Sequence, residues 1–239
     1  MERLENEREH GKKISGNAEE VWGWTSPAGK IRADRRANYL YSLGKYKKGD
    51  KLLEIGCGTG LFTQKVYDAT HADIIATDIS EDLLVVARQT HPIAEYKVED
   101  AMNLSFHDNS FDGVYGSSIL HHLDMEKSLK EIYRVLKPGG SAVFAEPNML
   151  NPQILIQKNV AFIKKALGDS PDETAVVRWQ MKKMMKDIGY KNIKVFPYDF
   201  LHPYTPVFLI PIVNAIGRIV EKIPILKEIA GSNIVYGEK

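Results

Sequence analysis

Short apolar runs alternate with amphipathic stretches through the middle of the chain, between residues 50 and 147. The runs are a few residues long, as buried strands are, and several end in a carboxylate, for example the run 73–78 in Asp78. The stretches between them repeat apolar residues at helical spacing, and one begins with a hydroxyl at Ser80 followed by two acids, which is typical of a helix start. Strands that alternate with helices form a parallel sheet with right-handed crossovers. We therefore predict an α/β, doubly wound core over 50–147.

The segments that flank this core are also predicted to be ordered. Residues 1–49 favour a helical N-terminal cap, because Ile31 and Tyr39 recur near one side of a helix. The C-terminal half, 148–239, is predicted to contain helices over 153–167 and 174–188 and strands over 191–196 and 232–236. A chain of 239 residues with 44% hydrophobic residues can form one sizeable core, so we expect a single domain over 1–239.

A long segment, residues 198–230, lies between the last two predicted strands and contains four prolines among many apolar residues. A hairpin loop at this place needs only two to five residues, so the segment is predicted to be an inserted subdomain. Its apolar surface suits the wall of a binding pocket, which we favour, a dimer interface or a contact with a membrane surface. Arg218, Glu221, Lys222 and the prolines argue against a membrane-spanning helix.

The segment from Glu54 to Gly60 reads E-I-G-C-G-T-G and follows the first apolar run directly. Glycines at every second position allow a sharp turn and let the backbone come close to a bound ligand. The spacing differs from the dinucleotide fingerprint G-x-G-x-x-G, whose last interval is one residue longer. The turn therefore favours a ligand whose polar end is an amino acid over one with a diphosphate.

Two carboxylates end the next two predicted strands. Asp78 lies about 20 residues beyond the glycine turn, where a strand-end acid can bind the two hydroxyls of a ribose. Asp100 closes the strand predicted over 96–101. Because ligands bind at the carboxyl ends of strands in doubly wound folds, we prefer a binding role for both acids to helix capping or simple solvation.

These blocks resemble the class I S-adenosylmethionine-dependent methyltransferases of the small-molecule type. The resemblance is close over about 50–147, where I-L-H-H-L at 119–123 and K-P-G-G at 137–140 follow the glycine turn and the two acids in the family's order. It implies a Rossmann-like, seven-stranded sheet of order 3-2-1-4-5-7-6, with the last strand antiparallel. In this arrangement 1–49 is a helical preface, and 198–230 is an insertion on the acceptor side of the site.

The resemblance also implies which residues hold the cofactor, S-adenosyl-L-methionine, and its product, S-adenosyl-L-homocysteine. The expected contacts are Glu54, Gly56, Cys57, Gly58, Gly60, Asp78, Ile79, Asp100, Ala101, Met102 and Ser117. Among these, Glu54 would attract the α-ammonium of the ligand, and Asp78 would accept from both ribose hydroxyls. Asp100 and the Ala101 amide would contact the adenine edge, and Met102 would flank the ring.

His121 and His122 are the catalytic candidates. Small-molecule methyltransferases often keep a polar residue here, facing the transferred methyl group. An imidazole has a pKa suited to removing a proton from a hydroxyl or an acidic carbon near neutral pH. The alternative is that one histidine caps the following helix with Asp124 and the other packs in the core. Glu146 and His202 are weaker candidates on the acceptor side.

Two features of the N-terminal cap have an open interpretation. Trp22 and Trp24 could form a lid over the bound donor, with an aromatic face toward the sulfonium, or a hydrophobic clamp that fixes the cap to the sheet. The basic residues Arg32, Arg35 and Arg36 are interpreted as a solvated face, with contact to an anionic acceptor as the alternative.

Composition narrows the function further. Thirty-two basic and 31 acidic residues leave a formal charge of +1, which argues against nucleic acid as a partner. The single cysteine, Cys57, has no partner for an internal disulfide and no metal-type Cys/His cluster around it, so we predict no metal site and a cytoplasmic location. The N-terminus has no apolar signal region, and no apolar run approaches the ~20 residues of a membrane span. Peripheral membrane contact and a homodimer remain open.

The sequence thus predicts methyl transfer to a small acceptor. No N/D-P-P-Y/F block follows the fourth strand, which argues against methylation of an amide or adenine nitrogen. The apolar insertion favours a hydrophobic acceptor such as a lipid, an isoprenoid, a quinone or a polyketide-like molecule. The alternatives are an inactive cofactor-binding scaffold protein on the same fold and a nucleotide-dependent oxidoreductase.

Overall fold

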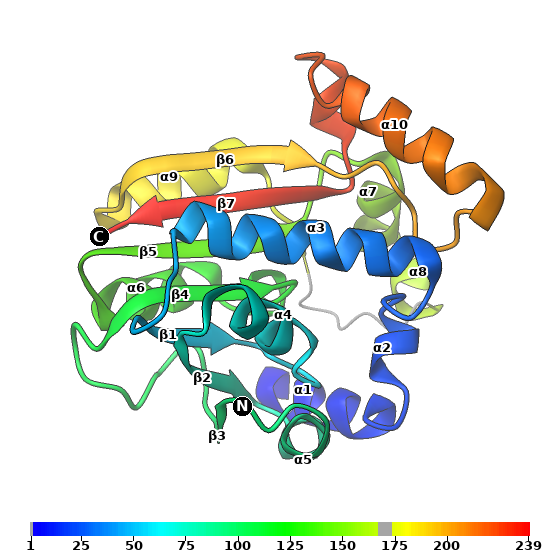
Figure 1. Cartoon of the computed structure of the whole chain (residues 1–239). Helices are drawn as coiled ribbons and strands as arrows, with labels where there is room; N and C mark the ends of the chain where they lie inside the picture. Colours follow the sequence, from blue (N-terminus) through cyan, green and yellow to red (C-terminus); the bar gives the residue numbers. More distant parts are fainter. Residues whose placement is uncertain (1, 167–173) are drawn as a thin grey trace.

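A single seven-stranded sheet organises the computed structural model, which describes residues 2–166 and 174–239 (Figure 1). The strands are β1 Lys51–Ile55, β2 Asp73–Asp78, β3 Glu95–Val98, β4 Phe111–Ser117, β5 Leu136–Pro147, β6 Lys191–Tyr198 and β7 Ser232–Glu238. Their order is β3-β2-β1-β4-β5-β7-β6, which confirms the order that the family resemblance implies. β1 to β5 are parallel, whereas β7 is antiparallel to both of its neighbours. The carboxyl ends of the parallel strands therefore meet at one edge of the sheet.

Helices cover both faces of this sheet. The α-helices are α1 Glu2–Ile14, α2 Ala18–Val21, α3 Pro27–Gly44, α4 Leu61–Thr70, α5 Glu81–Thr90, α6 Met125–Val135, α7 Pro152–Asn159, α8 Ala161–Ala166, α9 Arg178–Ile188 and α10 Ile210–Val220. Three short 3-10 helices are η1 Leu120–His122, η2 Val207–Leu209 and η3 Leu226–Ile229. In Figure 1, α3 and α4 lie in front of the sheet, and α6 and α9 lie behind it.

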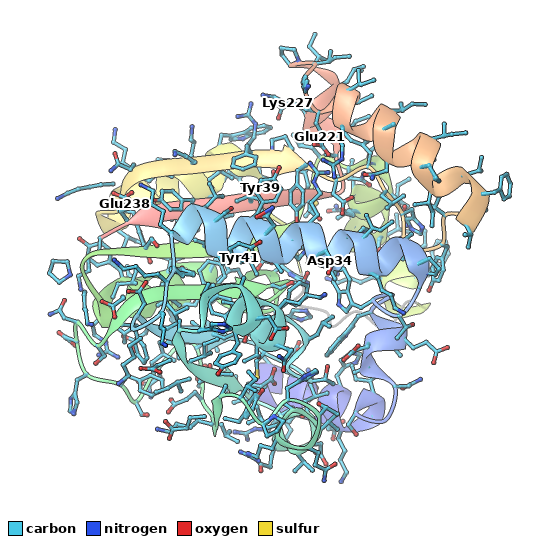
Figure 2. All side chains as sticks on the ribbon, in the orientation of Figure 1. Asp34, Tyr39, Tyr41, Glu221, Lys227 and Glu238 are labelled. Atoms are coloured by element: carbon cyan, nitrogen blue, oxygen red, sulfur yellow. The ribbon has the colours of Figure 1, made fainter. Side chains whose placement is uncertain are left out.

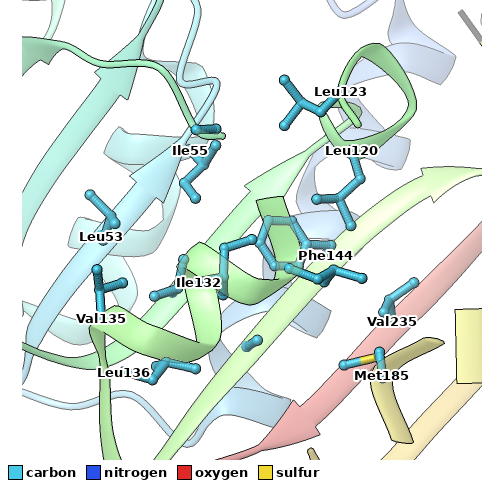
Figure 3. Packing of buried hydrophobic residues seen from close by; sticks show 14 of the residues in the cluster. Leu53, Ile55, Leu120, Leu123, Ile132, Val135, Leu136, Phe144, Met185 and Val235 are labelled. Carbon is cyan, nitrogen blue, oxygen red and sulfur yellow. The ribbon is translucent and has the colours of Figure 1, made fainter. Parts of the chain in front are cut away.

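The core consists of two apolar layers, one on each face of the sheet. Successive strand residues alternate between the layers, since side chains along a strand point to opposite faces. Leu53 belongs to the layer that α6 and α9 cover, together with Ile132 and Met185, as Figure 3 shows. Leu52, one residue earlier, packs in the other layer with Leu40 of α3. This double burial explains why the central strands read as nearly continuous apolar runs in the sequence.

Several predicted boundaries differ in the structure; the strands predicted over 191–196 and 232–236, for example, each extend two residues further. The helix predicted over 174–188 begins only at Arg178, because Val176 pairs with Asn148 as an extended bridge. The helix predicted over 153–167 is divided into α7 and α8 near Val160, and position 167 lies outside the described residues. The third strand ends before Asp100, which lies in the turn that follows.

The predicted insertion between β6 and β7 is present and contains η2, α10 and η3. It extends beyond the end of the sheet at the upper right of Figure 1. Its three acids all pair with arginines of the rest of the protein, in the pairs Arg32–Asp199, Arg35–Glu221 and Arg178–Glu228. Glu221 lies on the side of the insertion that faces α3 (Figure 2). The prediction that Arg32 and Arg35 form a solvated face is therefore wrong, because both hold the insertion in place.

No helix among residues 2–166 and 174–239 is both long and apolar enough to cross a membrane.

Candidate functional site

A cavity of about 450 Å³ opens at the carboxyl ends of the parallel strands. Its lining includes most of the residues that the sequence predicts for the site, namely Gly56, Cys57, Gly58, Asp78, Ile79, Asp100, Ala101, Ser117, His121 and His122. Three predicted cofactor residues, Glu54, Gly60 and Met102, do not line it. One cavity thus brings together the glycine turn, Asp78, Asp100 and the histidine pair.

The glycine turn between β1 and α4 has no room for side chains. Gly56 and Gly58 have φ angles of 68° and 55°, in the left-handed region that favours glycine. A Cβ at Gly56 would lie 2.5 Å from Ile119 Cγ1, and one at Gly58 would lie 2.8 Å from the Trp22 ring. Gly60 ends the turn and is the N-cap residue of α4. The turn therefore keeps its backbone exposed to the cavity only with glycine at these positions.

Asp78 is held in place by the backbone around it. Its Oδ2 accepts from the Gly58 amide and its Oδ1 from the Ser80 amide, both at 2.9 Å. Burial raises the pKa of this carboxyl, although the two amides oppose the shift. Each oxygen keeps a further lone pair for a hydroxyl of a bound ribose. This geometry fits the predicted role of Asp78.

Asp100 lies in the turn after β3 and also lines the cavity. Its Oδ1 accepts from the Met102 amide at 2.9 Å, which orients the carboxylate. The Met102 side chain packs against the core layer that contains Ile132. The contribution of Met102 that the structure supports is therefore its amide, and Ala101 lines the cavity beside Asp100.

Glu54 lies beneath the glycine turn instead of in the cavity. Only 1% of the residue is exposed, and its carboxylate accepts from the hydroxyls of Thr63 and Tyr115 at 2.5 and 3.0 Å. Burial raises the pKa of the Glu54 carboxyl to about 7, although the hydrogen bonds from the two hydroxyls oppose this shift. The position supports the turn from below, and a direct contact with the α-ammonium group of the cofactor is not part of this geometry.

His121 forms a buried pair with Glu146. Its Nδ1 lies 2.8 Å from Glu146 Oε2, while Glu146 Oε1 accepts from the amides of Ile119 and Leu120. Burial acts to raise the pKa of Glu146, but the bonds from His121 and the two amides outweigh it and the pKa falls, so the group is a carboxylate. A carboxylate can only accept, so the proton of the imidazole is on Nδ1 and Nε2 keeps a lone pair.

The imidazole of His121 is neutral near pH 7. Burial lowers its pKa, and the neighbouring His122 ring, 4.1 Å away, adds to this effect, whereas Glu146 opposes it. His122 Nδ1 lies 3.2 Å from Glu7 Oε1 of α1. Asp124, not a histidine, caps α6 by accepting from the Lys127 amide. The structure therefore excludes helix capping as the role of either histidine.

Helix α1 closes one side of the cavity, which the sequence does not predict. It contributes Arg3, Leu4, Glu7, His10 and Ile14 to the lining. A usable signal for this contact is Gly11 in the middle of the helix, because a Cβ there would overlap the Ser80 side chain. A glycine inside a helix often marks such a close approach.

Trp22 and Trp24 form the hydrophobic clamp considered from the sequence and also line the cavity. Both line the cavity, and Trp22 lies against Gly58 of the turn. Trp24 packs edge-on against Phe62 of α4 at 5.4 Å and lies under the Arg36 guanidinium at 5.0 Å. The pair therefore clamps the N-terminal helices to the core and at the same time bounds the cavity.

Arg36 is buried, contrary to the prediction of a solvated face. It is 3% exposed, and its guanidinium donates to the hydroxyls of Ser117 and Ser118 at 3.0 and 2.7 Å and to those of Tyr198 and Ser232. No carboxylate pairs with it among the described residues. Because Ser117 and Ser118 both line the cavity, Arg36 places a buried positive charge directly behind its wall.

The remaining wall comes from α7 and not from the insertion. Ile154, Gln157 and Lys158 line the cavity, whereas none of residues 198–230, all of which the structure describes, does so. The prediction that the insertion forms the pocket wall is therefore wrong for this cavity. His202 is exposed and interacts with Gln153, so it is also remote from the lining.

The seven-stranded sheet has the architecture of the Rossmann-like methyltransferase fold. Residues 53–144 match the family model described as "Methyltransferase domain", which covers β1 to the middle of β5.

Proteins similar in sequence to this chain include named methyltransferases. An uncharacterized methyltransferase-like protein of Schizosaccharomyces pombe is 27% identical, over 70% of this chain and 64% of its own length. A demethylmenaquinone methyltransferase of Paenarthrobacter aurescens is 29% identical, over 62% of this chain and 66% of its own length. The alignments thus span just under two thirds of each of these two relatives.

The fold has close structural counterparts. One is a chain in the complex between the Haloferax volcanii Trm112 methyltransferase activator and a putative methyltransferase, with a TM-score of 0.70 and 18% identity. The match covers 95% of this chain and 96% of that chain.

Proposed function

We propose that the protein transfers the methyl group of S-adenosylmethionine to a small organic acceptor with an apolar body. One observation supports this most directly: the glycine turn, Asp78 and Asp100 line the same cavity as His121, which is paired with the buried Glu146. When bound, S-adenosylmethionine supplies a methyl carbon that is already electrophilic. The protein then has to orient the acceptor at about 3–3.5 Å from that carbon and exclude water.

The lining beyond the cofactor residues supports an acceptor that is largely apolar. Leu4, Ile14, Leu123 and Ile154 contribute apolar side chains, and Trp22 adds an aromatic surface. Arg3, Glu7, His10, Gln157 and Lys158 add polar groups among them, so this part suits an acceptor with an apolar body and a polar substituent. The demethylmenaquinone methyltransferases among the relatives are compatible with an acceptor of this kind.

His121 is proposed to act as the general base. Its proton is on Nδ1 and is held by Glu146, so Nε2 is free to accept a proton from a hydroxyl or an acidic carbon of the acceptor. Glu146 stabilises the positive charge that forms on the ring. Glu146 is therefore a positioning residue, because it acts through His121.

The first test is calorimetric titration of the protein with S-adenosylhomocysteine, beside an Asp78→Asn variant. We expect binding by the wild type and a loss of affinity of about tenfold or more in the variant, because the charge-assisted bonds to the ribose are weakened. Ser80→Ala, which leaves the Asp78 carboxylate intact, serves as the matched control. Equal affinity of Asp78→Asn and wild type would remove Asp78 from the site.

The second test is transfer of a labelled methyl group. The protein is incubated with methyl-labelled S-adenosylmethionine and a panel of quinols, isoprenoids and polar amines, and the products are partitioned into organic solvent. We expect label in the organic phase with at least one apolar acceptor. Transfer to the amines alone would contradict the apolar acceptor, and binding of the cofactor with no transfer to anything would favour a scaffold protein.

A further inference from the structure

The insertion between β6 and β7 exposes a set of apolar side chains that no described part of the chain covers. Six of them are 55% to 81% exposed, and we call them the apolar face: Val207, Phe208, Ile212, Ile216, Ile219 and Ile225. They come from η2, from α10 and from the turn before η3. Single exposed apolar residues are common, but such a concentration on one short segment marks an interaction surface.

Helix α10 directs this face away from the protein. Its buried residues, Ile210 and Gly217, pack toward the body, and Gly217 lies against Phe200. Ile212, Ile216 and Ile219 follow one another at steps of four and three residues, which places them along the opposite side. A helix that only packs on a protein core carries polar residues on that side. The outward side of α10 is apolar instead.

The acids and the cations of the insertion differ in their partners. All three of its acids, Asp199, Glu221 and Glu228, are held in ion pairs with arginines of α3 and α9. Its three cations, Arg218, Lys222 and Lys227, have no ion pair among the described residues. The insertion therefore combines the apolar face with positive charge that its own acids do not neutralise, exposed at Arg218 and Lys222 and half-buried at Lys227.

We propose that the apolar face docks on the surface of a lipid bilayer with anionic headgroups. The isoleucines of α10 enter the boundary between headgroups and acyl chains, and Arg218, Lys222 and Lys227 contact the headgroup charges. Apolar residues on one side of a helix, with basic residues beside them, are the pattern of helices that lie in this boundary. A bilayer is also a partner for which a protruding helix needs no complementary groove.

The charge distribution argues against a second copy of the chain as the partner. A symmetric dimer brings the same patch of both subunits together. Six cations would then meet across the interface without an acid of the insertion left to pair with them, which disfavours the contact. An anionic surface compensates these charges directly.

The position of the apolar face relative to α7 is consistent with an acceptor that comes from the bilayer. The Asn151 side chain, at the N-cap of α7, donates to Ile229 O of η3 at 2.8 Å, so α7 and the insertion are neighbours. Ile154 of α7 lines the cavity, while Leu155 and Ile156 are 47% and 51% exposed on the outside. Helix α7 thus separates the cavity from the surface beside the apolar face.

Flotation of the full chain with vesicles tests the proposal. Vesicles of phosphatidylcholine alone are compared with vesicles that contain about one third phosphatidylglycerol. We expect association with the anionic vesicles, and weakening when salt is raised, since each basic residue near such a surface contributes about fivefold to the partition coefficient. Equal binding to both vesicles, or to neither, would overturn the proposal.

Two double variants separate the two parts of the surface. Arg218→Glu with Lys222→Glu is expected to lower partitioning about 25-fold or more, because two attractive charges are lost. Its matched control is Lys182→Glu with Lys186→Glu on the exposed side of α9, which makes the same change of charge elsewhere. Ile216→Glu with Ile219→Glu is expected to abolish association. Equal losses in the α9 control would show that net charge alone is measured.

Two further measurements keep these results interpretable. Each variant is titrated with S-adenosylhomocysteine, and unchanged affinity shows that the fold and the cofactor site are intact, whether or not the protein is an active methyltransferase. Light scattering without lipid determines the oligomeric state. A wild-type dimer that becomes a monomer in the Ile216→Glu with Ile219→Glu variant would assign the apolar face to self-association and overturn the proposal.

Discussion

Glu146 connects the backbone of η1 with the imidazole of His121. Its carboxylate accepts from the amides that begin η1 and from His121 Nδ1, so one buried side chain fixes both the backbone and the ring. A buried carboxylate with three donors is well compensated, which allows it to remain charged inside the protein. The orientation of His121 toward the cavity therefore depends on Glu146.

Substitutions at this pair are expected to change turnover more than cofactor binding. Once an acceptor is known, His121→Ala should lower kcat by about 10²–10⁴-fold, the usual contribution of a general base. Glu146→Gln should also lower kcat, because an amide can impose the other tautomer on the ring. His71→Ala, at an exposed histidine, is the matched control. Unchanged turnover in His121→Ala would remove this residue from the mechanism.

The pH profile gives an independent check on His121. Because burial lowers its pKa below the ordinary histidine value, the base is already neutral above about pH 6.5. We expect kcat to be constant from there upward as far as this group is concerned, and to fall only at lower pH. A fall that begins above pH 7 and disappears in a His121 variant would contradict this assignment.

Glu54 should make stability depend on pH. Its pKa is about 7 in the folded protein and near 4.5 in the unfolded chain, so the folded state binds more protons between these values. Stability contributed by the neutral form is present below pH 4.5 and is lost as the pH rises through 7. We expect Glu54→Gln to remove this dependence on pH. Between pH 5 and pH 8, the free energy of unfolding of the variant should therefore rise by about 2–3 kcal/mol relative to that of the wild type. Urea unfolding at several pH values measures this difference, and parallel profiles would contradict it.

At the scale of single elements, the glycine turn and the N-terminal helices depend on each other. Trp22 occupies the space beside Gly58 that a side chain would need, and Trp24 extends the contact to Phe62 of α4. The close approach is possible only because the turn has no side chains at these positions. The turn therefore both opens its backbone to the cavity and receives the helices that bound it.

Gly58→Ala tests this dependence. The φ angle of 55° costs an L residue roughly 1–2 kcal/mol, and the overlap with Trp22 adds to this. Gly49→Ala is the matched control, because Gly49 has a φ of 92° but no atom within 4 Å of a Cβ. We expect a larger loss of stability in Gly58→Ala, and a loss of S-adenosylhomocysteine affinity only there. Equal losses in both variants would show that the contact with Trp22 does not matter.

The helices and strands also show which structural features the sequence can predict. The strands follow from apolar runs that end in recognisable turns and acids, since both signals are local, whereas their order follows from the family resemblance. The start of α9 cannot be predicted from local signals, because Val176 is held extended by Asn148, which is far away in the sequence. For the same reason the periodicity around Arg36 identifies a helix but not which of its sides the sheet covers.

The residues of the site also divide into those that local patterns predict and those that depend on distant contacts. Asp78 and Asp100 are predictable because the ends of parallel strands meet at one edge. The contributions of α1 and α7 to the lining depend on contacts between distant parts of the chain, which no local pattern encodes. The insertion was predicted to be apolar and present, but its position relative to the cavity depends on the three ion pairs that hold it.

At the scale of the whole molecule, binding of the product should stabilise the fold. A ligand that binds only the folded state at 100 times its Kd adds about 2.7 kcal/mol. For a chain of 239 residues this corresponds to a rise in Tm of roughly 5–10 °C. Thermal unfolding with S-adenosylhomocysteine measures the rise, and a nicotinamide dinucleotide is the control. Stabilisation by the dinucleotide alone would favour an oxidoreductase.

Two kinds of element line the cavity on opposite sides. The loops at the strand ends line one side, and the helices α1 and α7 line the other. Neither helix belongs to the sheet, so each can change its residues while the architecture that recognises the donor stays intact. Exchanging these two helices between relatives is therefore a route to transplant acceptor preference. A chimera of this kind would keep its methyl source and gain a new chemical target.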